Sequence, residues 1–215
     1  MTEKKAILLG ASGLVGNELL HLLIHDNYFT HIHILSRKPL SIQHTKVTVE
    51  CIDFLDGTSL EAAITECDTV FCCIGTTQKQ VQGDKHRYRD IDYGIPIRVA
   101  QVCKQKHINH FSLVSSIGAN STSSNFYLHL KGETEQALQQ FPIPSIAIFR
   151  PSMLLGNRTQ SRPAETISKY IMQAISWLIP ATYKPIHARK VAYSMLWYAK
   201  QKLLGVQIVE NKYMI

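Results

Sequence analysis

Tyr127 and Lys131 stand four residues apart, a spacing that places two side chains on the same face of a helix. A tyrosine hydroxyl with its ordinary pKa of about 10 exchanges protons poorly at neutral pH. A neighbouring ammonium group lowers that pKa by favouring the phenolate. Ser115 and Ser116 precede this pair at the end of a predicted strand and offer a hydroxyl that orients a substrate oxygen. We therefore predict proton donation from Tyr127 to a carbonyl oxygen during hydride transfer.

The tyrosine–lysine spacing is not specific by itself, because Tyr198 and Lys202 repeat it. This second pair falls in the last predicted helix, far from any strand end that carries a serine, and we expect it on a solvated helix face. The first pair is preferred because it follows Ser115 and Ser116 along the chain.

A glycine-rich turn near the N-terminus indicates a phosphate site. Gly10, Gly13 and Gly16 lie between an apolar run and an amphipathic one, which predicts a strand, a tight turn and a helix start. Glycines let the backbone approach a pyrophosphate, and the free N–H groups and dipole of a helix N-terminus favour negative charge. The alternative is a turn that only connects two elements. The predicted phosphate contacts are Gly10, Ser12, Gly13, Leu14, Val15 and Gly16.

The end of the second predicted strand distinguishes between the two nicotinamide dinucleotides. An acidic residue at this position binds the adenosine ribose of NAD, but here residues 31–36 run into Arg37 and Lys38. A basic pair suits a 2′-phosphate, which Arg37 can bind through two hydrogen bonds. We predict NADP (as NADPH) rather than NAD, with an ordinary basic surface turn as the alternative.

Two further strand ends fit the same binding edge. Asp53 and Phe54 follow the third strand, where a carboxylate can meet an adenine amino group, although a lone Asp is more often a cap. Gly75 ends the fourth strand and permits close passage of the adenosine side. Its neighbours complete the set of predicted cofactor contacts: Ile74, Gly75 and Thr76.

Apolar runs alternate with helical stretches along the whole chain, which predicts βαβ units and a mostly parallel, doubly wound α/β sheet of the Rossmann type with helices on both faces. We expect one domain over residues 1–215, with lid elements at about 156–190 and polar loops at 76–89 and 120–125 near the binding edge. Strands are predicted at 5–10, 31–36, 46–52, 69–75, 110–116, 144–149 and 206–210. Helices are predicted at 14–25, 58–66, 90–106, 126–140, 163–178 and 187–202.

The composition of the chain argues against membrane, nucleic-acid-binding and metal-binding proteins. Hydrophobic residues make up 45% of the 215, and no apolar run approaches the roughly 20 residues that span a bilayer, so we expect a cytosolic protein that does not bind membranes. The net charge of +7 is scattered as pairs rather than gathered into a stripe with aromatics, which argues against nucleic acid. The ten histidines and five cysteines show no metal-ligand spacing, so no metal site is predicted.

The motifs together resemble those of a short-chain dehydrogenase/reductase, and more narrowly the atypical group around the Tat-interactive oxidoreductase family and its bacterial relatives. The resemblance is carried by Gly10-x-x-Gly13-x-x-Gly16, Ser115-Ser116, Tyr127-x-x-x-Lys131 and Arg150-Pro151. It extends over residues 73–77, 113–119, 124–133, 150–156, 158–163 and 210–212, nearly the whole chain.

The resemblance implies a Rossmann-type fold, NADPH binding and a Ser–Tyr–Lys site. Tyr127 would be the general acid and Lys131 its partner, both near the cofactor, with Pro151 as a further contact. The serine precedes the tyrosine by 11 or 12 residues, fewer than in classical members, which leaves Ser115 and Ser116 as alternatives.

The predicted function is NADPH-dependent reduction of a small carbonyl substrate. Two alternatives stay open: an NADPH-binding regulatory protein with a protein partner, and a sugar-nucleotide epimerase-like enzyme. A homodimer is a further expectation.

Overall fold

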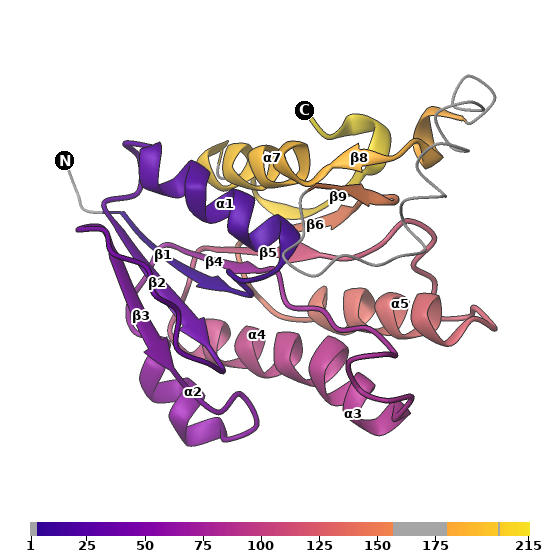
Figure 1. Ribbon diagram of the computed structural model, residues 1–215, viewed down its shortest axis with the longest axis horizontal. Helices are drawn as coiled ribbons and strands as arrows, with labels where there is room; N and C mark the ends of the chain where they lie inside the picture. The colour runs from indigo at the N-terminus through magenta and orange to yellow at the C-terminus, as the bar shows by residue number, and fades with distance from the viewer. Residues whose placement is uncertain (1–3, 157–179, 202) are drawn as a thin grey trace.

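The computed structural model describes residues 4–156, 180–201 and 203–215, and its centre is a seven-stranded parallel sheet (Figure 1). The strand order is β3-β2-β1-β4-β5-β6-β9, so the direction of winding reverses between β1 and β4. In such sheets ligands bind beyond the carboxyl ends of the strands at this reversal. The predicted Rossmann-type sheet is confirmed. Its strands are β1 (Lys5–Leu9), β2 (His31–Ser36), β3 (Val47–Cys51), β4 (Thr69–Cys72), β5 (His110–Val114), β6 (Ser145–Arg150) and β9 (Gly205–Glu210).

Helices cover both faces of the sheet. On one face α1 (Leu14–His25) packs beside α7 (Ala188–Gln201), and on the other lie α2 (Gly57–Ala63), α4 (Ile95–Gln105) and α5 (Phe126–Leu138) (Figure 1). Strand β1 shows why both faces are apolar. Ala6 and Leu8 point into the core beneath α1 and α7, whereas Ile7 and Leu9 point into the core beneath α4 and α5. A strand buried on both faces needs such an unbroken apolar run.

The polar stretch 76–89, predicted as a loop, contains a short helix, α3 (Lys85–Arg89). The helix begins here because the Asp84 carboxylate accepts hydrogen bonds from the backbone N–H groups of His86 and Arg87. A π-helical turn, η1 (Asp90–Gly94), joins α3 to α4, so the predicted helix at 90–106 does not begin as an α-helix.

After β6, the predicted helix 187–202 and strand 206–210 are present as α7 and β9, and the structure adds elements that were not predicted. A two-stranded parallel sheet pairs β7 (Leu154–Leu155) with β8 (Ile186–His187), and two 3₁₀ turns, η2 (Ala181–Tyr183) and η3 (Asn211–Tyr213), complete the fold. The predicted helix 163–178, the motif at 158–163 and most of the lid at 156–190 lie outside the described residues. Tyr198 is not on a solvated face as expected, because its ring packs edge-on against Phe149, 5.5 Å between centroids.

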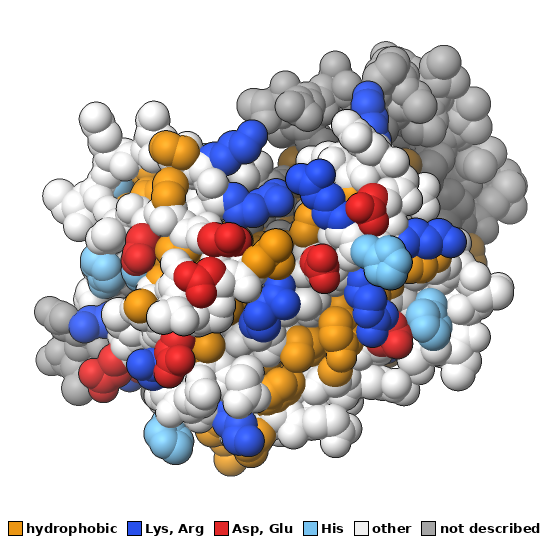
Figure 2. All heavy atoms as spheres, turned by 90° about the horizontal axis from the view of Figure 1, so that it is seen from below, with side chains coloured by type: hydrophobic (Ala, Val, Ile, Leu, Met, Phe, Trp, Pro, Cys, Tyr) orange, Lys and Arg blue, Asp and Glu red, His pale blue; other side chains and the backbone are white. Residues whose placement is uncertain are grey.

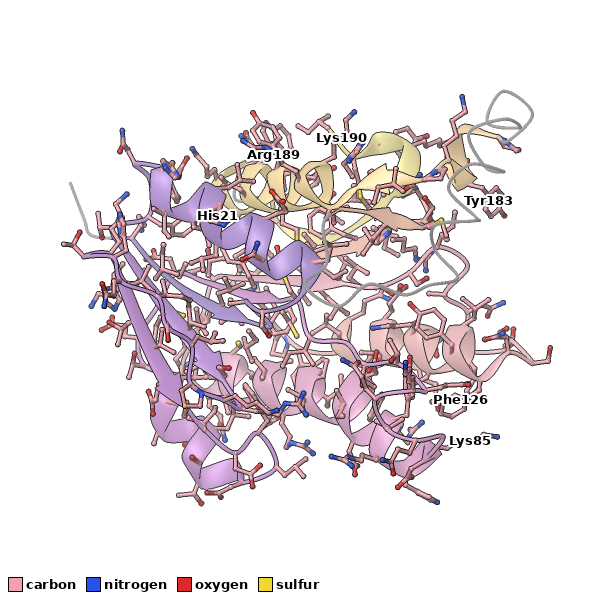
Figure 3. All side chains as sticks on the ribbon, in the orientation of Figure 1. His21, Lys85, Phe126, Tyr183, Arg189 and Lys190 are labelled. Atoms are coloured by element: carbon pink, nitrogen blue, oxygen red, sulfur yellow. The ribbon has the colours of Figure 1, made fainter. Side chains whose placement is uncertain are left out.

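Charges of both signs are mixed over one face of the molecule. On the face formed around α4 and α5, Lys and Arg side chains alternate with Asp and Glu side chains (Figure 2). On the opposite face His21, Arg189 and Lys190 point outward from α1 and α7 (Figure 3). Among the described helices, none is both long and apolar enough to cross a membrane.

Candidate active site

The glycine turn brings the start of α1 against the ends of β1 and β4. Gly10 has φ +81°, a left-handed conformation that favours glycine, and a Cβ there would lie 2.5 Å from the carbonyl oxygen of Cys73. A Cβ at Gly16 would lie 2.1 Å from the Gly10 carbonyl oxygen. Side chains are therefore excluded at both positions, and the spacing of these glycines is what lets helix and strand approach so closely.

The N-terminus of α1 is open to an anion. Its N-cap residue, Gly13, has no side chain to accept from the first turn, whereas side chains cap α2, α3 and α5. The first N–H groups of a helix have no partner within it, and no acidic residue occupies the first turn of α1. The Gly13 N–H itself donates to the Gly10 carbonyl, 2.9 Å. The donors left for a phosphate are those of Leu14, Val15 and Gly16, with the exposed Ser12 beside them.

The residues predicted to contact the adenosine half of the dinucleotide follow the ends of β2 and β3, and they differ in solvent exposure. Arg37 and Lys38 are exposed directly after β2. Asp53 is exposed and caps a turn, since its Oδ1 accepts from the Leu55 N–H at 2.9 Å. Phe54 is buried in the core, so its side chain belongs to the packing around α4.

Side chains of α3 and η1 hold the loop after β4 in place. Ile74, Gly75 and Thr76 follow the strand, and the Thr76 carbonyl accepts from the Tyr88 hydroxyl, 3.1 Å. The ring of Tyr88 packs edge-on against Phe126 at the start of α5. Figure 3 shows Phe126 beside Lys85 of α3, whose ammonium lies 5.5 Å from the ring centroid. Helix α3 thereby links the β4 loop to the end of α5 that carries Tyr127.

Tyr127 and Lys131 lie in the first two turns of α5. The helix begins there because the Asn125 side chain accepts from the N–H groups of Tyr127 and Leu128. Tyr127 is half-buried, while Lys131 is buried with its Nζ 3.0 Å from Oδ1 of Asp92. Burial lowers the pKa of Lys131, but the negative charge of Asp92 and the nearby Tyr127 outweigh it, and that pKa is raised above its usual value.

Ser115 and Ser116 have different environments. The buried Ser115 hydroxyl donates to the carboxylate of Glu135, which also accepts from Arg150 at 2.6–3.1 Å. The Ser116 hydroxyl is partly exposed and donates to the carbonyl oxygen of the next residue, 3.2 Å. Ser115 is thus committed to a buried ionic network, whereas Ser116 is open to a ligand.

The C-terminal segment supports this edge of the sheet. Arg150, at the end of β6, donates to Glu210 at 2.9 Å as well as to Glu135. The Ser152 N–H donates to Asn211 Oδ1 at 2.9 Å. Pro151 is buried, and its carbonyl accepts from the Ile117 N–H at 2.9 Å, which holds the loop after β5.

Sequence reasoning missed the acidic partners, Asp92 and Glu135. Asp92 had a signal, since it is the only acidic residue among the apolar positions 91–97 that begin a buried helix. Glu135 follows Tyr127 and Lys131 at the same four-residue interval, which places all three on one face of α5.

Comparison with known proteins shows the family to which the chain belongs. Residues 10–164 match the NAD(P)H-binding family. The chain belongs to that family. Its sequence is 32% identical to Protein HTATIP2 of Rattus norvegicus over 82% of this chain and 74% of that protein. It is 35% identical to the mitochondrial protein FMP52 of Debaryomyces hansenii over 73% of this chain and 70% of that protein. The expected family resemblance is therefore confirmed.

Solved structures agree on the fold of this NAD(P)H-binding protein. The UDP-N-acetylglucosamine 4-epimerase of Methanobrevibacter ruminantium superposes with a TM-score of 0.73 at 20% identity, over 98% of this chain and 77% of that one. Other neighbours are complexes with NAD. At this level of identity the likeness shows the fold, and the family match makes the chain a member of the NAD(P)H-binding family. The expectation of a cytosolic location is overturned, because the FMP52 relatives are named mitochondrial.

Proposed function

We propose that the protein is an NADP-dependent reductase of small carbonyl compounds. The observation that supports this best is the meeting of three elements at one edge of the sheet. The open N-terminus of α1, the glycine loop after β4 and the Tyr127–Lys131 face of α5 all lie beyond the carboxyl ends of the strands. The first turn of α1 would hold the phosphates of a dinucleotide at this edge, and Tyr127 and Lys131 of α5 would stand near its nicotinamide.

Each side chain has a separate task in this proposal. Bound NADPH supplies the hydride for the carbonyl carbon. Tyr127 donates its hydroxyl proton to the carbonyl oxygen, and the Lys131 ammonium stabilises the phenolate that develops. Ser116 donates to the same oxygen and orients it, because Ser115 is held by Glu135. Gly10 and Gly16 let α1 pack closely on the ends of β1 and β4, and Gly13 leaves the first turn of α1 without a side-chain cap, so that its N–H groups can donate to the pyrophosphate.

The preference for NADP rests on Arg37 and Lys38 and is testable by binding alone. We expect Arg37→Ala to weaken NADPH binding by about 10- to 100-fold, the effect of losing one charged hydrogen-bonding partner, and to leave NADH binding unchanged. Lys104→Ala is the matched control, since Lys104 is exposed near the end of α4, at the opposite edge of the sheet. Fluorescence titration measures the affinities of the wild type and of both variants for NADPH and for NADH. Tighter binding of NADH than NADPH by the wild type refutes the assignment.

Turnover is tested with a carbonyl panel, following the nicotinamide absorbance. Tyr127→Phe should bind NADPH as the wild type does and lose about 10²- to 10⁴-fold in rate. Tyr198→Phe, the same change in the second tyrosine–lysine pair, should have no such effect. Tight NADPH binding without oxidation by any carbonyl would favour a regulatory NADPH-binding protein that acts through a protein partner.

A sugar-nucleotide enzyme is the second candidate, because the fold matches an epimerase of known structure. The panel therefore includes UDP-sugars with NAD and with NADP. Epimerisation of a UDP-sugar in the absence of any carbonyl reduction would select this candidate over the reductase.

A further inference from the structure

Asp92 is a carboxylate with 1% of its surface exposed, in the π-helical turn η1. A carboxylate in an apolar interior is costly unless its charge is compensated. π-Turns occur often at functional sites. Here the turn places Asp92 in the core, while Asp90, two residues earlier in the same turn, is exposed. The structure thus holds one of two neighbouring aspartates inside the protein.

The contacts of Asp92 connect both sides of the candidate site. One carboxylate oxygen lies 3.0 Å from the Lys131 ammonium, and the other accepts from the Thr76 N–H at 2.8 Å. Its backbone carbonyl accepts from the hydroxyl of Thr134, 3.2 Å, one turn further along α5. A single residue therefore fixes the lysine of α5 relative to the loop that follows β4.

Asp92 also dominates the electrostatics around Lys131. The titratable groups that face this ammonium are Asp92 from η1, Tyr127 from α5 itself, Tyr88 from α3 and Cys72 from β4. Of these, Asp92 is the only carboxylate, and it forms the ion pair with the Lys131 ammonium. Without it, burial would favour the neutral amine.

We propose that Asp92 is a positioning residue of the site: it keeps Lys131 charged within the protein and fixes that charge beside Tyr127 and the β4 loop. The consequence for chemistry rests on the proposed function, because only a charged Lys131 stabilises the phenolate left when Tyr127 gives up its proton. The consequence for Lys131 itself does not depend on any cofactor or substrate.

The first test is made on the protein without cofactor. In Asp92→Asn, we expect Lys131 to bind its proton at least about tenfold more weakly, because the counter-charge is lost while burial remains. The ¹³Cε resonance of Lys131, assigned with Lys131→Arg, reports this over a pH titration. Asp90→Asn, which removes the exposed charge of the same turn, should leave the titration unchanged. An unchanged Lys131 titration in Asp92→Asn overturns the proposal.

The second test is a pH profile. In Asp92→Asn, kcat/KM for carbonyl reduction should fall as pH rises through the lowered pKa of Lys131, in a range where the Asp90→Asn control is flat. A loss of activity that is equal at every pH, as a purely structural role would give, would contradict the proposal. If no carbonyl is reduced by the wild type, the proposed function fails, while the resonance of Lys131 still decides the role of Asp92.

Asp92→Asn also leaves Lys131 without its partner, so its stability is a third measurement. In the double variant Asp92→Asn/Lys131→Met neither charge remains, and urea unfolding should show it to be more stable than Asp92→Asn alone. This comparison holds even if the single variant does not fold. A double variant no more stable than the single one would contradict the coupling of the two residues.

Discussion

Gly132 should be intolerant of even one added carbon, although alanine is the better helix former. It lies inside α5, directly after Lys131, and a Cβ there would sit 2.1 Å from the backbone nitrogen of Ser121 and 2.3 Å from the carbonyl carbon of Asn120. This loop cannot withdraw freely, because the Asn120 N–H donates to the Leu128 carbonyl of the same helix at 3.0 Å. Both contacts are with backbone atoms, so no side-chain rotation relieves them.

The magnitude follows from two opposing effects. Overpacking a close-packed site costs about 1–3 kcal/mol, and contact with backbone places Gly132→Ala near the upper end of this range. Alanine recovers about 1 kcal/mol of helix propensity. We therefore expect a net loss of about 2 kcal/mol in the free energy of unfolding, or about 4–8 °C in Tm for a protein of this size.

Urea unfolding of Gly132→Ala measures this loss, and Gly57→Ala is its matched control. Gly57 is also helical, but a Cβ there would meet no atom within 4 Å, so alanine should stabilise the protein by about 0.4–1 kcal/mol. Gly132→Ala should also lower reductase activity, since the displaced loop connects Ser116 to α5. A Gly132→Ala variant as stable as the wild type would refute the packing argument.

Two further predictions concern buried ionisable groups. Burial lowers the pKa of His110 to about 4. Below about pH 6.5 this imidazole therefore stays unprotonated in the folded protein but takes up a proton in the unfolded chain. His110 should therefore lower the free energy of unfolding by about 3 kcal/mol as pH falls from 6.5 to 4. The difference in this free energy between the wild type and His110→Gln, measured by urea unfolding, should narrow over that interval. A difference that does not change with pH would contradict the prediction. Glu135→Gln should destabilise the protein by about 2–3 kcal/mol and Glu210→Gln by less than about 1 kcal/mol, because Glu135 is buried against Arg150 and Glu210 is partly exposed. Equal losses in the free energy of unfolding for the two variants, measured by chemical denaturation, would show that burial does not decide how much each ion pair of Arg150 contributes.

The central strands of the sheet were predictable because they are buried on both faces. Runs such as 70–72 have no polar residue to break the pattern, and at Gly10 the turn between β1 and α1 has a left-handed backbone with no room for a side chain. Helix α3 was missed because its five residues carry little apolar surface. Its signal was the capping Asp84, a local feature that periodicity does not detect.

The candidate site was predictable in its residues but not in its pairings. The Tyr127–Lys131 spacing lies within one helix, whereas the partner of Lys131 comes from a segment far earlier in the chain. Ser115 and Ser116 are adjacent in sequence, so only their side-chain directions separate them, and these depend on the position of Glu135. Which of two identical neighbours faces the core is decided by tertiary packing.

The last 28 residues affect how the chain folds as it is synthesised. Helix α7 is the partner that covers α1, and β9 is the only strand, among those described, that pairs with the outer edge of β6. The part of the apolar surface of α1 that packs against α7 is made within the first 25 residues and therefore stays uncovered until almost the whole chain has been made. Folding is thus dominated by contacts between distant parts of the sequence, which slows it and leaves apolar surface open to aggregation or chaperones. Chains that stop before residue 188 should bind chaperones rather than accumulate as a smaller version of the same sheet.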